Sequence, residues 1–442
     1  MKIPSSPASF RPLNFLIAAL AVGLAGCGEK KQEPPPPTPV PQAEAAPTSA
    51  TKNSFSAVTS KLDSGGDLYL YFNAARIMSG LSNKVTAFSN LMASLPDNSD
   101  RHQENVQRGM ALVGRLIEDS GIEKLNGVGV SAIETEPGAI REKVISHHDK
   151  GEDSGLMWSV CGAAPHPLDG LGLLPSDTAL AAFGDFDAPL LWNTVAKDLR
   201  DLHIAEVDSN LDALPTQFLA RTGMKLDDVL ASVGGEYGLI LTLNDQTKIA
   251  IPIPGHPVQI PEPGLVIVAK VKDDAIFNRV AEVLKDNPMV VTNDEPGLKM
   301  RVMPLPLPIP ISLRLSVARS GDYLFIASSD KLVRDILAAK AGTNAFRDGA
   351  EFKTVAQGMP ATGNAFFLVS DRLSTVVMQA QQDIATNQST ANALQAMQNA
   401  WGSLGRLGGS AYAVASNGDE GWEVTARRVT HPAEPPAAVT KN

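Results

Sequence analysis

A short β-rich run, a polar residue and then a helical stripe recur in this order along the chain. The runs cover residues 68–72, 179–183, 265–268, 323–326 and 365–369, and each is followed by Asn, Asp or Ser. These polar side chains accept hydrogen bonds from the free N–H groups that open a helix. The repetition therefore predicts strands and helices that alternate along most of the sequence.

The stripes after these runs have helical spacing, as in Ile77, Leu81, Val85, Phe88 and Met92, so each is expected to bury one face. Three units continue with a second helix, a break that contains Gly, and one or two strands. In the third unit, the dipeptide at 417–418 is Asn-Gly, which is typical of a hairpin turn. A β-α-α-β-β unit repeated about every 100 residues predicts an α+β fold, with helices packed on mainly antiparallel sheets.

The first residues have the layout of an export signal. Lys2 and Arg11 are the only charges before an apolar run at 13–24, which is too short to span a bilayer as a helix. The run ends in Leu-Ala-Gly-Cys at 24–27, which resembles the bacterial lipobox. That resemblance implies cleavage after residue 26 and a lipid-bearing Cys27, and Gly28 in the next position implies the outer membrane in a double-membraned cell.

The residues that follow Cys27 predict a tether. Prolines crowd positions 34–47 without apolar periodicity, and about 25 residues of extended chain could span up to ~80 Å. The expected organisation is a signal peptide at 1–26, the lipidated Cys27 and Pro-rich tether at 27–52, modules at 53–260 and 261–430, and a disordered tail at 431–442.

Charge and cysteine content narrow the partners. Loss of the signal changes the formal net charge from −10 to −12, which disfavours nucleic acid as a partner. Cys161 is the only cysteine besides Cys27, so no internal disulfide is expected. Its apolar neighbours indicate a small buried hydrophobe rather than a nucleophile, which would need a base close by.

Two further segments resemble functional sites weakly. His147, His148 and Asp149 form the one cluster of metal-competent side chains, but adjacent histidines on a strand point to opposite faces. Ser328 and Lys331 have the Ser-x-x-Lys spacing of acylating serines without the companion motifs, and helix capping explains them. We assign no catalytic, metal or cofactor site from the sequence.

A Pro-rich segment at 303–311 carries the one candidate interaction site. Prolines at 304, 306, 308 and 310 remove every N–H from one edge of a strand, which favours a blocked edge strand that resists aggregation. The alternative is an apolar lip that contacts a partner protein or acyl chains. The lip consists of Leu305, Leu307, Ile309 and Ile311.

The segments at 173–180 and 352–360 resemble an uncharacterised family of exported bacterial proteins. This resemblance implies no activity. The leading interpretation is a membrane-anchored cell-envelope lipoprotein with a structural or interaction role and no cofactor. Its partners would be the membrane, through the lipid on Cys27, and an envelope protein. A carrier or chaperone for a hydrophobic ligand is the alternative, and a hydrolase ranks third.

Overall fold

The computed structural model describes residues 54–93, 100–152, 155–251, 258–305, 313–385 and 408–430. The expected signal peptide, Cys27 and the tether lie outside these residues. The strands are β1 (Leu68–Asn73), β2 (Gly127–Glu136), β3 (Ala139–His147), β4 (His166–Pro167), β5 (Thr178–Asp185), β6 (Val233–Ile251), β7 (Val258–Val271), β8 (Val291–Glu295), β9 (Leu298–Leu305), β10 (Leu313–Ser320), β11 (Tyr323–Ala327), β12 (Thr362–Gly363), β13 (Ala365–Val369), β14 (Gly409–Gly418) and β15 (Gly421–Thr430).

The helices separate the strands into short groups, and each of the five strand runs named from the sequence is followed by a helix, as the sequence predicts. They are α2 (Ser54–Thr59), α3 (Ala75–Met78), α4 (Leu81–Ala93), α5 (Asp100–Ser120), α6 (Leu156–Ser159), α7 (Ala188–Arg200), α8 (Ala205–Thr222), α9 (Leu226–Ser232), α10 (Ala275–Leu284), α11 (Asp330–Lys340), α12 (Ala350–Val355) and α13 (Asp371–Ala385), with 3-10 turns η1 (Ile122–Lys124), η2 (Asp169–Leu173) and η3 (Phe346–Asp348).

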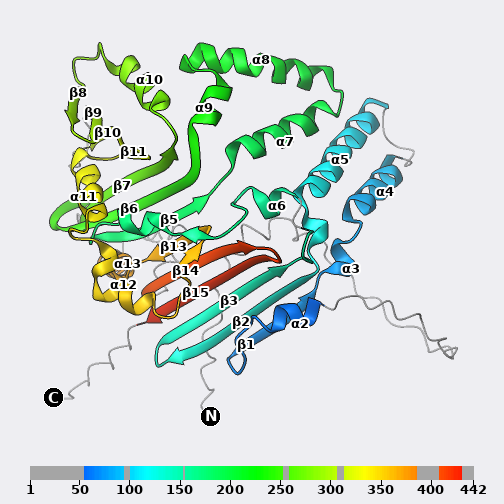
Figure 1. Cartoon of the computed structure of the whole chain (residues 1–442), viewed down its shortest axis with the longest axis horizontal. Helices are drawn as coiled ribbons and strands as arrows, with labels where there is room; N and C mark the ends of the chain where they lie inside the picture. The colour runs from blue at the N-terminus through cyan, green and yellow to red at the C-terminus, as the bar shows by residue number, and fades with distance from the viewer. Residues whose placement is uncertain are drawn as a thin grey trace.

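Thirteen strands form one sheet in the order β1-β2-β3-β15-β14-β13-β5-β6-β7-β11-β10-β9-β8 (Figure 1). Every neighbouring pair is antiparallel. The short strands β4 and β12 pair separately. The predicted α+β class with an antiparallel sheet is confirmed. The boundary expected at 260/261 falls inside β7, which pairs with β6 and β11.

One face of the sheet, here the first face, carries the main core. Alternate residues of the central strands, such as Phe183, Val268 and Phe325, are buried there. Leu332 and Ile336 of α11 pack against them, together with residues of η2, η3 and α12. Alternation along a strand therefore sends the intervening residues to the second face.

Two helices cover parts of the second face. Leu373 and Val377 of α13 cluster with Val369 of β13 and its neighbours. Phe277 of α10 packs against Leu324 of β11. These contacts lie at different rows of the sheet, so the second face is covered in patches.

Helices α7 and α8 lie along the top of Figure 1, and α4 and α5 lie at its right side, beyond the ends of the strands. The expectation that the 77–92 stripe is buried is wrong for Ile77 and Phe88, which are 49% and 54% exposed. The reason is that α4 contacts α5 through small residues: Ser89 is buried, and Gly114 lies beside Thr86. Among the described helices, none is both long and apolar enough to cross a membrane.

Two predicted local features have different outcomes. Helix capping is confirmed at Ser329, whose Oγ accepts a hydrogen bond from the Leu332 amide at the start of α11. The hairpin turn expected at 417–418 is wrong, because Asn417 pairs with Trp422 and the turn lies at 419–420. Asn417 stays in the strand since its side chain donates to the carbonyls of Trp158 and Gly162.

Candidate functional sites

A row of polar side chains ends the main core at one end of the first face. Asp185 of β5 pairs with Glu236 of β6, and Lys270 of β7 pairs with Tyr323 of β11. Asn364, just before β13, adjoins Asp185, whose amide donates to the Asn364 carbonyl at 2.8 Å. Directly opposed residues on antiparallel strands lie on the same face, so these five side chains form one continuous row.

His166 of β4 closes over this row and pairs with Asp185. Its Nε2 lies 2.9 and 3.0 Å from the two carboxylate oxygens of Asp185, and its Nδ1 lies 2.8 Å from the Pro167 carbonyl. Because both ring nitrogens face oxygen acceptors, the ring donates from both as an imidazolium. Partial burial lowers the pKa of His166, but the Pro167 carbonyl and the Asp185 carboxylate outweigh it and raise the pKa above its usual 6.5.

Glu236 is the most deeply buried charge of the row. Its side chain is 8% exposed, its Oε2 lies 3.6 Å from Lys270 Nζ, and Tyr323 Oη lies 3.5 Å from the same oxygen. Burial raises the pKa of Glu236, although Lys270 opposes the shift, and burial also raises the pKa of Tyr323. These groups form a buried polar network rather than a solvated ion pair.

The segment 161–167, here the strap, passes over the row and lines one side of an open cavity of 440 Å³. Gly162 in the strap has φ +96°, and a Cβ there would stand 2.4 Å from both Asn364 Nδ2 and Asp185 Oδ2. Gly235 in the opposite wall has φ +90°. The close approach of strap to row therefore requires glycine. Side chains that line this strap pocket include Ser159, His166, Asp185, Phe186, Glu236, Lys270 and Lys272.

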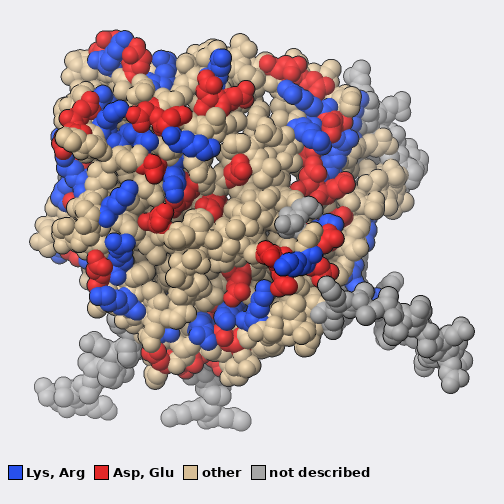
Figure 2. All heavy atoms as spheres, viewed as in Figure 1, with Lys and Arg blue, Asp and Glu red and all other residues tan. Residues whose placement is uncertain are grey.

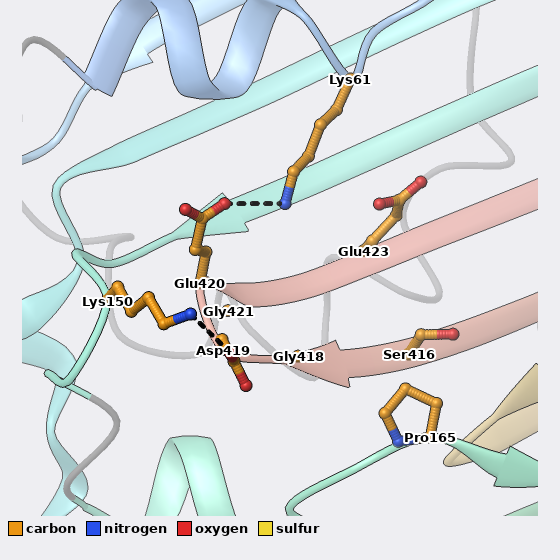
Figure 3. Close-up of a pocket in the computed structure, with 9 residues that line it drawn as sticks. All are labelled: Lys61, Lys150, Pro165, Ser416, Gly418, Asp419, Glu420, Gly421 and Glu423. Carbon is orange, nitrogen blue, oxygen red and sulfur yellow. Dashed lines mark ion pairs between the residues drawn. The ribbon is translucent and has the colours of Figure 1, made fainter.

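A second cavity of 420 Å³ lies at the β14–β15 turn (Figure 3). Figure 3 shows Lys61 directed at Glu420 and Lys150 directed at Asp419, with nitrogen–oxygen distances of 3.5 and 3.1 Å. These side chains are 34–77% exposed, and exposed ion pairs contribute little free energy. The hairpin cavity is therefore a solvated groove, whereas the strap pocket contains buried charge.

Apolar side chains are exposed on the second face of the sheet. Leu239 of β6, Ile267 of β7 and Ile326 of β11 stand opposite one another in one row, and are 37%, 50% and 42% exposed. Leu265, in the adjoining row, is 46% exposed. We call Leu239, Leu265, Ile267 and Ile326 the open strip.

The open strip continues a surface that helices cover on both sides. In the row of Leu265, Leu180 and Leu241 pack against the α13 cluster. In the row on the other side, Leu324 packs against Phe277 of α10. Among the described residues, the strip is thus a part of the second face that lies between the areas covered by α13 and α10. Elsewhere, Figure 2 shows Lys and Arg standing beside Asp and Glu over the face in view.

Cys161 differs from its expected environment, because it lies exposed in the strap rather than buried among apolar residues. Although the residue as a whole is exposed, partial desolvation of its thiol and the negative charge of Asp185 raise the thiol pKa, so the thiol stays protonated near neutral pH. His166 uses both ring nitrogens on Pro167 and Asp185, which leaves neither free to activate the thiol.

The remaining sequence candidates are placed as follows. His147 and His148 are buried; His147 Nδ1 bonds the Glu420 carbonyl, and His148 packs on Trp158 with ring centroids 4.5 Å apart. Within the described ranges, no three His, Cys, Asp or Glu side chains form a metal-binding group. Leu305 of the lip is half-buried and pairs with Leu313, while Leu307, Ile309 and Ile311 lie outside the described residues.

The sequence did not identify the strap pocket. Asp185 and Asp187 both follow the run at 179–183 and are expected to open a helix. Asp187 does so by accepting from the Leu190 amide, whereas Asp185 pairs with His166. The available signal was a polar residue at the end of each apolar strand, as at Asp185, Glu236 and Lys270.

Comparison with known proteins gave no match to a family model, a curated protein or a solved structure.

Proposed function

We propose that this protein is a lipid-anchored envelope protein whose body binds an apolar surface of another envelope protein through the open strip. The observation that carries this proposal is the exposure of Leu239, Leu265, Ile267 and Ile326 on central strands. Large contiguous apolar side chains left in water are typical of interaction surfaces.

The strip binds through side chains rather than by addition of a strand. β7 is hydrogen-bonded to β6 on one side and to β11 on the other, so its backbone has no free edge. Complete burial of an exposed Leu or Ile side chain contributes about 1.5–3 kcal/mol, and roughly half of that remains to be gained by side chains that are 37–50% exposed. Four such side chains therefore form an adequate centre for an interface whose rim includes α10 and α13.

The proposal is tested by a substitution that introduces a charge in the centre of the open strip. Ile267→Glu in the full-length chain, followed by mild cross-linking in native cells and identification of the captured protein, should abolish a specific complex. Leu219→Glu on α8, where Leu219 is 43% exposed, is the matched control and should leave the complex intact. Equal capture by both variants and the native chain would overturn the proposal.

The carrier alternative makes a different forecast from the same chain. Described cavities of 370–550 Å³ all have charged side chains in their walls, which does not favour an acyl chain. Lipid that copurifies with the native body and is lost from Ile267→Glu, without any captured protein, would support the carrier role instead.

We also infer that three parts of the sheet are copies of one unit. In β1–β3, β5–β7 and β13–β15, a strand is followed by helix and then by two strands that are neighbours in the sheet. This order supports the β-α-α-β-β modules expected from the sequence. A structural superposition of the three strand triplets with shared connectivity would test the inference.

A further inference from the structure

The strap pocket is independent of the open strip, because it lies at one end of the first face rather than on the second. Its volume of 440 Å³ falls in the lower part of the range for small-molecule sites, which is roughly 300–1,000 Å³. Its walls carry both signs of charge, and the two signs are not equally paired.

Glu236 provides an acceptor that the protein itself satisfies poorly. The side chain is more than nine-tenths buried and lines the pocket, yet its nearest partners lie at 3.5 and 3.6 Å. Good charge-assisted hydrogen bonds are about 2.7–2.9 Å long. Among the described residues, no shorter contact to this carboxyl group is present, so it suits a ligand that donates hydrogen bonds.

Lys272 provides an available positive charge. It is exposed, lines the same pocket, and forms no ion pair with any residue in the described ranges. Lys270 beside it is shared between Glu236 at 3.6 Å and Asp169 at 3.8 Å, and both distances are long. The two ammonium groups suit an incoming carboxylate.

The other two acids of the pocket already have close partners. Asp185 is paired with His166 and accepts from Asn364 Nδ2 at 3.0 Å. Asp187 accepts from the Leu190 amide at the positive N-terminus of α7. Glu236 is therefore the acid of the pocket with the longest contacts, at 3.5 and 3.6 Å against 2.9 Å for Asp185 and Asp187.

We propose that the strap pocket binds a small zwitterion, a free amino acid or a short peptide, with its ammonium group on Glu236 and its carboxylate on Lys270 and Lys272. Phe186 supplies the apolar part of the wall. The strap then acts as the outer wall, held in place by the contact between His166 and Asp185.

The experiment titrates the purified full-length protein by calorimetry with L-alanine, L-glutamate and the dipeptide alanyl-alanine. At least one of the three should bind saturably. Its N-acetylated and C-amidated forms should each bind at least tenfold more weakly, because each lacks one charge. No saturable binding by any of the three, or equal binding of the capped forms, would overturn the proposal.

Three variants test which residue binds the ammonium group of the ligand and which binds its carboxylate. Glu236→Gln, which keeps the shape, should remove the preference for a free ammonium group, and Lys272→Gln should remove the preference for a free carboxylate. Lys353→Gln, an exposed lysine on α12, should change neither preference. Unchanged preferences in the first two variants, with thermal unfolding unaltered, would contradict the assignment, and this result is independent of whether Ile267→Glu loses its protein partner.

Discussion

His166 and Asp185 hold the strap against the sheet, with Nε2 of the ring 2.9 Å from one carboxylate oxygen and 3.0 Å from the other. The two residues come from different strands, β4 and β5, that belong to different sheets. Asn364 Nδ2 also donates to the Ala164 carbonyl of the strap at 2.8 Å, and Asn417 Nδ2 donates to the Gly162 carbonyl. Among these contacts, the one between His166 and Asp185 changes with the protonation of the imidazole ring.

The first prediction concerns the pH dependence of this contact. Because the pKa of folded His166 is raised, its stabilisation is complete below about 6.5 and is lost as pH rises through the folded pKa. His166→Gln should therefore lower the free energy of unfolding at pH 5.5 by on the order of 1 kcal/mol, allowing for a side chain that is partly exposed.

The measurement is chemical denaturation of both proteins between pH 5.5 and 9. The difference between them should shrink as pH rises, while Asp185, Glu236 and Lys270, which also face the ring, are retained in both. A difference that stays constant over this range would show that the ring acts without its charge.

The second prediction concerns a buried acid between two helices. Asp198 on α7 is 1% exposed, and burial together with Asp119 on α5 raises its pKa to about 6. Its stabilising protonated form is present at acidic pH and is lost as pH rises through about 6. Asp198→Asn should thus raise the free energy of unfolding at pH 7 by on the order of 2 kcal/mol.

Thermal unfolding at pH 4 and pH 7 measures this effect. The stabilisation should be near zero at pH 4, where Asp198 is already neutral. Asp228→Asn, on the exposed surface of α9, is the matched control and should have little effect at either pH. Destabilisation by Asp198→Asn at pH 7 would refute the conclusion that burial and Asp119 penalise the ionised form of Asp198.

The third prediction separates the two readings of the Pro-rich segment. β8 pairs with β9 only as far as Val302, so Met303, Pro304 and Leu305 have a strand on one side alone. Replacement of Pro306 and Pro308 with Thr should restore two donors and increase self-association of the purified body. Light scattering of native and variant protein measures this change.

Substitution of the apolar residues of the same segment with Ser tests whether they pack into the core or bind a partner. If Leu305, Leu307 and Ile309 pack inward, each substitution should cost on the order of 2–5 kcal/mol and the body should unfold. We expect unfolding, together with aggregation of the threonine pair. Retained stability with loss of a captured partner would instead establish the binding lip.

The fourth prediction concerns the anchor. Cys27→Ser should prevent lipid attachment and release the protein from membranes, because stable anchoring requires acyl chains on that residue. Cys161→Ser, the matched control at the other cysteine, should leave membrane association unchanged. Membrane fractionation of cells that express each variant provides the readout. An unchanged distribution of Cys27→Ser would refute the lipoprotein assignment.

Local patterns were sufficient to predict the strands but not the surfaces. The apolar run before Ser370 is β13, and Ser329 caps α11, because both features depend on neighbouring residues in the sequence. The contact of His166 with Asp185 depends on strands from two sheets, and the exposure of Ile267 depends on where α10 and α13 end their coverage. Neither relationship has a signal within a short window of sequence.

The most direct test of the account is photo-cross-linking from the open strip in living cells. A benzophenone amino acid at position 267 should capture one envelope protein on irradiation, because Ile267 stands at the centre of the strip and is 50% exposed. The same amino acid at position 353 on α12 should capture none. Capture of the same proteins from both positions, or of none from position 267, would contradict the proposed interaction role.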